Sequence, residues 1–357
     1  MKNLCFFINT PGQVHSWRFL IYELINKGYR VKILARQYRH TLALLDRYEL
    51  EYTVYLVSPK SSYLKPVSFF AHLPKAYKLC RQFDADIVVG FGLDASLVGW
   101  LLHKPCIVFS DYEDIPLQHF VTKLFASVIL TPECFAKNLG KKHIRVAGYK
   151  ELAYLHPNHF ISDPSIYQEL GIGSDTKYVV LRFNASDAVH DISFRGFSTL
   201  DKYRLVEELS KYARVFVSTA GDLPKDLEVY RLPIHPSRIH HALCYAQMLV
   251  CDTRTMAWEA AVLGTPTITC GSFAGQMGNL TELEQKYGLL YTFREPDQAS
   301  GKALELIQQD DVKEKWAEKR NRLLQDKIDV TDFMVWFIEN YPHSFEECRR
   351  KQVRAME

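Results

Sequence analysis

The segment Asp252–Pro266 has the residue types and spacing of a phosphate-binding turn. It follows the apolar run Met248–Val250, passes through a hydroxyl-rich turn, and continues into an Ala-rich stretch that Gly264 closes. This pattern predicts a strand, a turn and a helix N-terminus. Unpaired backbone N–H groups and the positive end of the helix dipole attract anions there. Thr253 and Thr255 would add hydroxyl donors, so we expect a diphosphate as ligand.

Glu259 lies four residues beyond Thr255, one helical turn deeper on the same face. A carboxylate at this place could accept hydrogen bonds from two vicinal hydroxyls, such as those of a ribose. The alternative is an ordinary helix N-cap followed by a solvated glutamate. The spacing alone leaves both interpretations open.

The same segment fits the pattern D-[ST]-x-T-x-x-x-E-A-x-x-L-G-x-P and resembles the nucleotide-sugar site of GT-B glycosyltransferases and of the related UDP-N-acetylglucosamine 2-epimerases. Thr10–His15, Gly148–Glu151 and Gly264–Pro266 with Ser272–Phe273 give a closer resemblance, to a prokaryotic family of predicted glycosyltransferases classed as a domain of unknown function. The resemblance spans most of the chain. It implies an α/β protein with the GT-B fold: two Rossmann-like doubly wound domains face a central cleft, and a C-terminal helix returns to the N-terminal domain.

The order of apolar runs agrees with that architecture. Leu4–Ile8 reads as a strand, a helical pattern follows until Gly28, and Val31–Leu34 is the next strand, which is the opening of a doubly wound sheet. The opening lacks G-x-G-x-x-G, so a dinucleotide is not expected. With 357 residues, we expect an acceptor domain over 1–157, a donor domain over 158–328, and a crossover helix with a tail over 329–357.

Composition excludes several classes of protein. The chain has 44 basic and 41 acidic residues, a near balance that argues against a nucleic-acid partner. Its eight cysteines include no C-x-x-C pair, which favours reduced cysteines in a cytoplasmic protein and gives no zinc-ligand spacing.

No stretch has the length of a membrane span or the form of a signal peptide. We therefore expect a cytoplasmic protein, free or peripheral to the inner face of the membrane. The basic residues Arg349–Lys351 and Arg354 leave contact with anionic lipid open, although a frayed end is the simpler interpretation.

The N-terminal half offers two catalytic candidates. In GT-B enzymes, a histidine or acid near the first turn can deprotonate the acceptor, and the resemblance implies this role for His15. A helix-capping or exposed histidine is the alternative. The strand pattern Cys106–Phe109 leads into three acids, of which Glu113 is the candidate for substrate contact. Asp111 and Glu113 need not both face a ligand, because side chains alternate along a strand.

In the C-terminal half, the resemblance places Arg182 against the donor phosphates, where a guanidinium binds a diphosphate well. A surface ion pair is the alternative. His240 and His241 are adjacent and cannot share a helix face, which weakens a metal site there. The remaining donor-binding candidates, most of them suggested by the resemblance, are Asn184, Ser218, His235, Asp252, Met256, Gln276 and Asn279.

The first functional hypothesis is a metal-independent glycosyltransferase without a cofactor. It would transfer a sugar from a nucleotide-sugar donor, a UDP-sugar by resemblance, to a sugar, glycan or lipid-linked acceptor in cell-surface polysaccharide or glycan synthesis. The helix dipole and Arg182 would stabilise the leaving group.

A second hypothesis is a UDP-N-acetylhexosamine 2-epimerase or hydrolase that uses the acids Asp94, Asp111 and Glu113 with His190. The Asp-Thr-x-Thr turn replaces the Ser-Gly-Gly expected of an epimerase, which favours transfer. A third hypothesis is a non-catalytic nucleotide-sugar-binding protein. The oligomeric state is not predicted.

Overall fold

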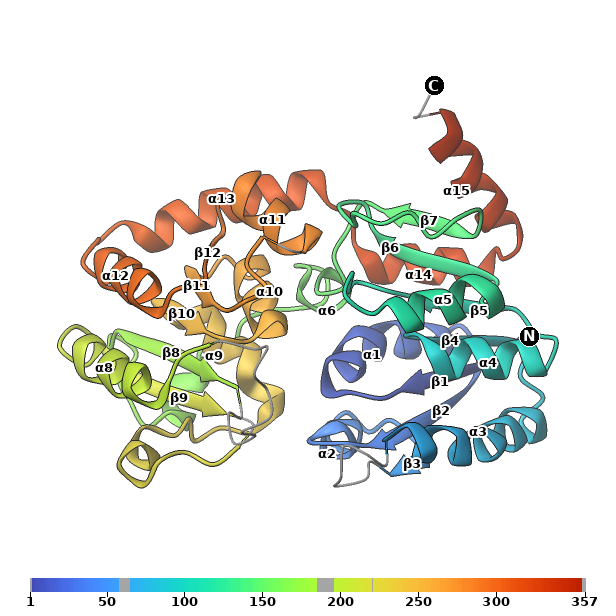
Figure 1. Ribbon diagram of the computed structural model, residues 1–357, viewed down its shortest axis with the longest axis horizontal. Helices are drawn as coiled ribbons and strands as arrows, with labels where there is room; N and C mark the ends of the chain where they lie inside the picture. Colours follow the sequence, from blue (N-terminus) through green and yellow to red (C-terminus); the bar gives the residue numbers. More distant parts are fainter. Residues whose placement is uncertain (1, 58–64, 185–195, 220, 276, 355–357) are drawn as a thin grey trace. The chain divides into compact units, whose positions relative to one another are not determined.

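The computed structural model describes residues 2–57, 65–184, 196–219, 221–275 and 277–354 (Figure 1). The chain divides into two compact units. The first unit is formed by the chain up to His159 together with the chain from Ile328 onward, and the second by Phe160–Lys327. Gln276 and His190 lie outside the described residues.

The first unit is built on a seven-stranded parallel sheet with the order β3-β2-β1-β4-β5-β6-β7. Its central strands are buried along their whole length, because helices cover both faces of a parallel sheet, and this is why they read as continuous apolar runs. The strands are β1 (Asn3–Ile8), β2 (Arg30–Gln37), β3 (Tyr52–Val57), β4 (Ile87–Gly90), β5 (Cys106–Phe109), β6 (Val128–Pro132) and β7 (His143–Val146).

Helices alternate with these strands along the chain, and two further helices come from the C-terminus. The helices of the first unit are α1 (Pro11–Asn26), α2 (Thr41–Arg47), α3 (Lys65–Gln82), α4 (Leu93–Leu101), α5 (Pro116–Phe125), α6 (Leu152–Leu155), α14 (Val330–Glu339) and α15 (His343–Arg354).

The second unit repeats the design with a five-stranded parallel sheet in the order β12-β11-β10-β8-β9. Its strands are β8 (Tyr178–Phe183), β9 (Arg214–Thr219), β10 (Met248–Cys251), β11 (Thr267–Cys270) and β12 (Leu290–Phe293). Its helices are α7 (Ile166–Glu169), α8 (Thr199–Leu209), α9 (Ile239–Tyr245), α10 (Arg254–Val262), α11 (Gly278–Gln285), α12 (Pro296–Ile307) and α13 (Val312–Asp326), with 3₁₀ turns at Lys225–Tyr230 and Pro236–Arg238.

Both sheets are doubly wound, as the sequence predicts. In the first, the chain runs from β1 outward to β2 and β3 and then returns to place β4 on the other side of β1. In the second, it runs from β8 to β9 and returns to place β10 on the other side of β8. Ligands of open α/β sheets bind at the carboxyl ends of the two strands that flank such a reversal. The pairs β1/β4 and β8/β10 are therefore where the two units can form binding sites.

Glycine ends two helices at the places the sequence indicates. Gly28 follows α1 with φ +87°, and Gly264 follows α10 with φ +76°. These left-handed conformations are readily adopted only by glycine. Gly28 N–H donates to Ile25 O, and Gly264 N–H donates to Ala261 O, which ends each helix and turns the chain toward its next strand.

The predicted C-terminal crossover helix is confirmed. Thr331 Oγ1 in α14 donates a hydrogen bond to Ala153 O at 2.7 Å. Lys2 Nζ donates to Ile338 O at 3.2 Å and to Tyr341 O at 3.2 Å, so the end of α14 is bound to the start of the chain. None of the helices in the described part of the chain combines the length and apolar character that crossing a bilayer requires.

Two details differ from the sequence pattern. Residues 303–327 have the periodicity of one long helix, but α12 ends at Ile307 and α13 begins at Val312. Residues 343–354, expected as a frayed tail, form α15, whose Ser344 is buried and donates its hydroxyl to Phe337 O at 2.7 Å.

Candidate functional site

The carboxyl edge of the five-stranded sheet brings together side chains from β8, β9 and β10. Arg182 lies opposite Cys251 of β10 on one side and opposite Ser218 of β9 on the other. Arg182 Nη1 donates a hydrogen bond to Ser218 Oγ at 2.7 Å. Two predicted donor-binding residues are thus in contact. Cys251, the strand partner of Arg182, directly precedes Asp252.

Asp252 binds backbone groups on the neighbouring segment. Its side chain is buried, and its Oδ1 accepts a hydrogen bond from Asn184 N–H at 2.6 Å. A Cβ added to Gly196 would lie 2.7 Å from Asp252 Oδ2, so the backbone approaches the carboxylate closely there. Burial raises the pKa of Asp252 to about 6, although hydrogen bonds from the backbone of Asn184 and Phe197 act to lower it. Asp252 therefore fixes the chain at positions 184 and 197 beside the helix N-terminus.

The first turn of α10 has no side-chain cap. Its N-cap Thr253 is extended, with φ −121° and ψ 134°, and makes no capping hydrogen bond. The Thr253 Oγ1 atom is shielded from solvent and has no hydrogen-bond partner among the described residues. Thr253–Met256 are partly exposed, whereas Ala257–Val262 are buried, so only this first turn is accessible. A helix N-terminus at the reversal of a parallel sheet is a phosphate-binding geometry.

Glu259 is buried one turn deeper in α10 and pairs with a histidine from α9. Glu259 Oε1 lies 3.1 Å from His240 Nε2, and both side chains are under 8% exposed. The sequence indicates His240 only together with His241, as a weak candidate for a metal site. It gives no sign of the pair with Glu259, because the partners are 19 residues apart on different helices. The histidine fixes one oxygen of the carboxylate and so its orientation.

Two other predicted residues lie in different settings. His235 is exposed and caps the 3₁₀ turn Pro236–Arg238, since its Nδ1 accepts a hydrogen bond from Ser237 N–H at 3.2 Å. Asn279 is buried in the first turn of α11, whose N-cap Met277 makes no side-chain capping bond. Arg254 Nη1 lies 3.5 Å from Met277 Sδ, which joins the starts of α10 and α11.

The reversal in the first unit holds a second polar cluster. Asn9 Nδ2, after β1, donates to Asp94 Oδ2, after β4, at 2.6 Å, and Tyr55 OH donates to Asn9 Oδ1 at 2.7 Å. Burial raises the pKa of Asp94, although hydrogen bonds from Tyr55 and Asn9 oppose the shift. The sequence points to Asp94 for the epimerase hypothesis but not to Asn9 or Tyr55. Asn9 has only its place directly after β1 as a signal, and Tyr55 lies within β3 with none.

A buried ion cluster lies at the carboxyl ends of β5 and β7. Lys150 Nζ is 2.5 Å from Asp111 Oδ2 and 3.4 Å from Glu151 Oε1, and all three side chains are nearly inaccessible. Burial alone would lower the pKa of Lys150, but the two carboxylates raise it above the ordinary lysine value. Lys150 is therefore a fixed cation in the first unit.

The two predicted catalytic residues are both buried. His15 stacks on Tyr154, with ring centroids 5.5 Å apart, and its Nδ1 lies 3.3 Å from Tyr48 OH. The backbone oxygen of Glu113 accepts hydrogen bonds from Lys137 Nζ at 2.6 Å and from His119 Nε2 at 3.2 Å. Their catalytic roles stay predictions.

Three residues of the first unit offer ligand atoms close enough to hold a metal. His159, Asp329 and Asp332 place such atoms within 4.8 Å of one another. Asp329, however, is the N-cap of α14 and accepts hydrogen bonds from Thr331 N–H at 2.9 Å and from Asp332 N–H at 3.2 Å. Its Oδ2 is also 2.9 Å from His159 Nε2. The contacts are those of a helix cap bound to a histidine.

No protein-family model matches the sequence, and no curated protein is detectably similar to it. Solved structures do share its fold. The structure of S. aureus MnaA with UDP superposes with a TM-score of 0.70 at 13% identity, covering 96% of this chain and 98% of that one. The UDP-GlcNAc 2-epimerase from Neisseria meningitidis bound to UDP-GlcNAc gives 0.66 at 16% identity, covering 95% and 100%.

Glycosyltransferases are similar as well. Spinosyn rhamnosyltransferase SpnG, complexed with spinosyn aglycone, gives a TM-score of 0.62 at 12% identity, covering 95% of this chain and 100% of that one. Because these likenesses extend over nearly the whole chain, this protein has the GT-B fold.

Proposed function

We propose that the protein binds a nucleotide sugar at the N-terminus of α10 and transfers the sugar to an acceptor. The observation that carries the proposal is the helix N-terminus of α10, whose N-cap Thr253 makes no side-chain capping bond, next to the strand end that carries Arg182 at the chain reversal of the second sheet. The N–H groups of this turn and the guanidinium would together bind a diphosphate. Structures with the same fold contain UDP or UDP-GlcNAc, which supports a uridine nucleotide as the donor.

Each donor-side residue has a role in this proposal. Thr253 and Thr255 would donate hydroxyls to phosphate oxygens, and Glu259, oriented by His240, would accept from the ribose hydroxyls. As the glycosidic bond breaks, negative charge develops on the leaving diphosphate. The α10 dipole and Arg182 would stabilise that charge.

The acceptor would be a sugar, a glycan or a lipid-linked sugar. Contact with substrate is assigned to Glu113, because Glu113 follows the carboxyl end of β5. Deprotonation of the acceptor hydroxyl is assigned to His15 on the strength of the family resemblance alone. His15→Ala would test the assignment, because the loss of a general base lowers the rate about 10²- to 10⁴-fold while donor binding persists.

A second candidate function is the 2-epimerase reaction. It is favoured by the buried Asp94 cluster at the strand reversal of the first sheet, because burial raises the pKa of Asp94 and carboxyl groups with raised pKa values are common among catalytic acids and bases. Incubating the protein with UDP-N-acetylglucosamine and no acceptor separates the two functions. An epimerised UDP-sugar detected by NMR indicates the epimerase, and free UDP with an altered free sugar indicates the hydrolase. Turnover only with added acceptors indicates the transferase.

Donor binding is tested by thermal shift with UDP, GDP, CMP, dTDP and their sugars. A nucleotide at 100 times its Kd should stabilise the protein by about 2.7 kcal/mol, which is several degrees for a chain of this size. We expect Arg182→Gln and Glu259→Gln to lose most of the shift. Arg231→Gln is the matched control, because Arg231 lies in the same unit but pairs with Glu228 on the surface.

The outcomes separate the hypotheses. If no nucleotide stabilises the wild type, the donor-site proposal is wrong. If all three variants respond like the wild type, the ligand binds elsewhere. Binding of a UDP-sugar without turnover on any acceptor, without release of UDP and without any change in the bound sugar would instead indicate a non-catalytic nucleotide-sugar-binding protein.

A further inference from the structure

Helix α5 of the first unit presents its apolar side chains outward. Leu117, Phe120 and Leu124 are 69%, 62% and 52% exposed, whereas its two buried residues, His119 and Thr122, are polar. The spacing of three and four residues places the exposed side chains on one face. An ordinary surface helix has the reverse arrangement, with its apolar stripe against the core.

Two polar side chains on the inward face of α5 form hydrogen bonds to backbone oxygens. Thr122 Oγ1 lies 2.9 Å from Gln118 O and 3.2 Å from His119 O. His119 Nε2 lies 3.2 Å from Glu113 O. The Thr122 hydroxyl is thus satisfied within α5, and His119 joins the inward face to the preceding loop, so the outward apolar side chains belong to the native arrangement of this helix.

The neighbouring helix extends the apolar surface. Trp100 and Leu101 at the end of α4 are 51% and 40% exposed. The Trp100 ring lies 4.9 Å from the ring of Phe125 in α5, and Figure 1 shows the two helices side by side along the sheet. We call Trp100, Leu101, Leu117, Phe120 and Leu124 the α4–α5 face. Apolar patches formed by several large side chains usually mark an interaction site.

The two segments that carry the α4–α5 face have charges of one sign. Residues 95–110 and 115–132 contain two lysines, Lys104 and Lys123, and no acidic residue. Lys123 is exposed within α5, between Phe120 and Leu124. Lys142 adds a third cation at the end of the helix, where its Nζ donates to Lys123 O at 3.3 Å and to Leu124 O at 3.1 Å.

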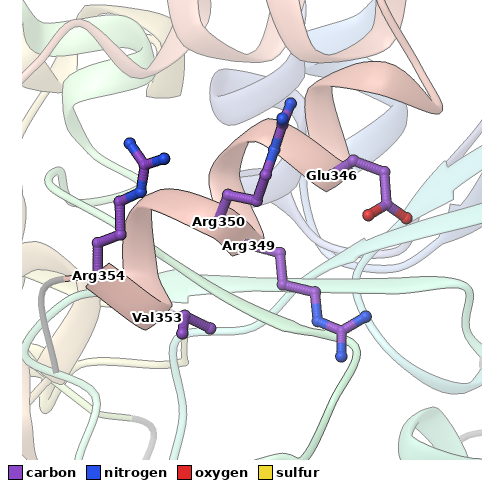
Figure 2. Close-up of a pocket in the computed structure, with 5 residues that line it drawn as sticks. All are labelled: Glu346, Arg349, Arg350, Val353 and Arg354. Carbon is purple, nitrogen blue, oxygen red and sulfur yellow. The ribbon is translucent and has the colours of Figure 1, made fainter. Parts of the chain in front are cut away.

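Further cations lie on α15, which packs against β7 of the same sheet. Figure 2 shows Arg349, Arg350 and Arg354 projecting from α15. Together with Glu346 and Val353 they line an open pocket of about 400 Å³. These arginines add positive charge to the unit that carries the α4–α5 face.

We propose that the α4–α5 face docks the protein on an anionic lipid bilayer. The exposed Trp, Phe and Leu side chains would enter the boundary between headgroups and acyl chains, and Lys123 and Lys142 would lie among the anionic headgroups. A second copy of the chain fits less well. A twofold contact through this face would bring the same lysines together, and these segments supply no acid to pair with them.

The test is flotation of the full-length protein with vesicles of phosphatidylcholine, with and without phosphatidylglycerol. We expect binding that requires phosphatidylglycerol and weakens as salt is raised. Phe120→Ser/Leu124→Ser should lower binding about tenfold or more, because two large apolar contacts are lost. Lys123→Glu should lower it at least about fivefold through charge alone.

The matched control is Ile161→Ser/Leu200→Ser, which removes two exposed apolar side chains from the second unit and should bind like the wild type. Failure of the wild type to float, or equal binding by Phe120→Ser/Leu124→Ser, would overturn the proposal. So would a wild-type dimer in analytical ultracentrifugation that this double variant dissociates, because a second copy would then cover the face. Nucleotide thermal shifts of the variants should equal those of the wild type, so that docking and donor binding are judged separately.

Discussion

The carboxyl group of Asp252 is subject to two opposing effects. Burial disfavours its ionised form, while the N–H groups of Asn184 and Phe197 favour it. Burial is the stronger effect and raises the pKa to about 6. Near neutral pH the buried carboxylate is therefore ionised, and its ionisation lowers the free energy of unfolding. The same residue fixes the backbone beside the proposed phosphate site.

This balance leads to a prediction for stability against pH. Since the pKa of Asp252 rises from 3.8 to about 6 on folding, the folded protein binds more protons than the unfolded chain between these values. The contribution of Asp252 to the free energy of unfolding is fully present below pH 3.8 and is lost as pH rises through about 6. The loss should be on the order of 3 kcal/mol.

Urea unfolding at several pH values measures this effect. Asp252→Asn keeps an oxygen acceptor but cannot titrate, so the stability of the wild type minus that of the variant should fall between pH 4 and pH 7. Parallel pH profiles for the two proteins would show that Asp252 does not titrate in this range.

The sequence can predict a polar contact when the contact follows from the order of strands in the sheet. Arg182 and Ser218 both end apolar runs, and parallel strands bring such ends to one edge of a sheet, where the structure joins them. The Glu259–His240 pair does not follow from strand order, because it depends on how α9 packs against α10. The Lys150–Asp111 contact likewise requires the packing of β5 and β7 ends, which no local pattern encodes.

At the scale of elements, strands and glycine-ended helices could be predicted because their signals are local. The run Met248–Val250 predicts β10, and Gly264 marks the end of α10. The break between α12 and α13 could not be predicted, since residues 308–311 contain neither Gly nor Pro. Tertiary contacts impose it: α12 packs on β11 and β12, whereas α13 packs on α10 and reaches α9, where Lys313 Nζ donates to Cys244 O at 3.0 Å.

The N-cap residue of α14, Asp329, leads to a testable prediction about the stability of one element. Asp329 accepts hydrogen bonds from the first turn of α14 and contacts His159, so Asp329→Ala should cost about 1–2 kcal/mol in urea unfolding. Asp311→Ala is the matched control, because Asp311 precedes α13 without a side-chain capping bond, and its cost should be under about 0.5 kcal/mol. Equal costs would mean that the cap contributes no specific stability.

At the scale of the molecule, the first unit contains both ends of the described chain. Helix α14 packs against α1 and α6 and buries Phe337 and Ile338 completely. The second unit, in contrast, is one continuous segment. The core of the first unit is therefore incomplete until residues beyond 328 have joined it.

Shortening the chain tests this dependence. A chain ending at Lys327 should lose hydrogen-exchange protection in β1–β7 and keep it in β8–β12, because only the first unit loses core side chains. A chain ending at Pro342 keeps α14 and should retain protection in both sheets. Full protection of β1–β7 in the shorter chain would show that α14 is dispensable for the first unit.

The continuity of the second unit also sets an order of events during synthesis. All of Phe160–Lys327 leaves the ribosome before α14 does, so the second unit can fold while the first unit still lacks its last long helices. Until then, the apolar side chains of α1 that α14 will cover stay exposed. A nascent chain paused after residue 327 would thus be the form most dependent on chaperones, and arrested ribosome complexes of that length should recruit them more strongly than the released protein does.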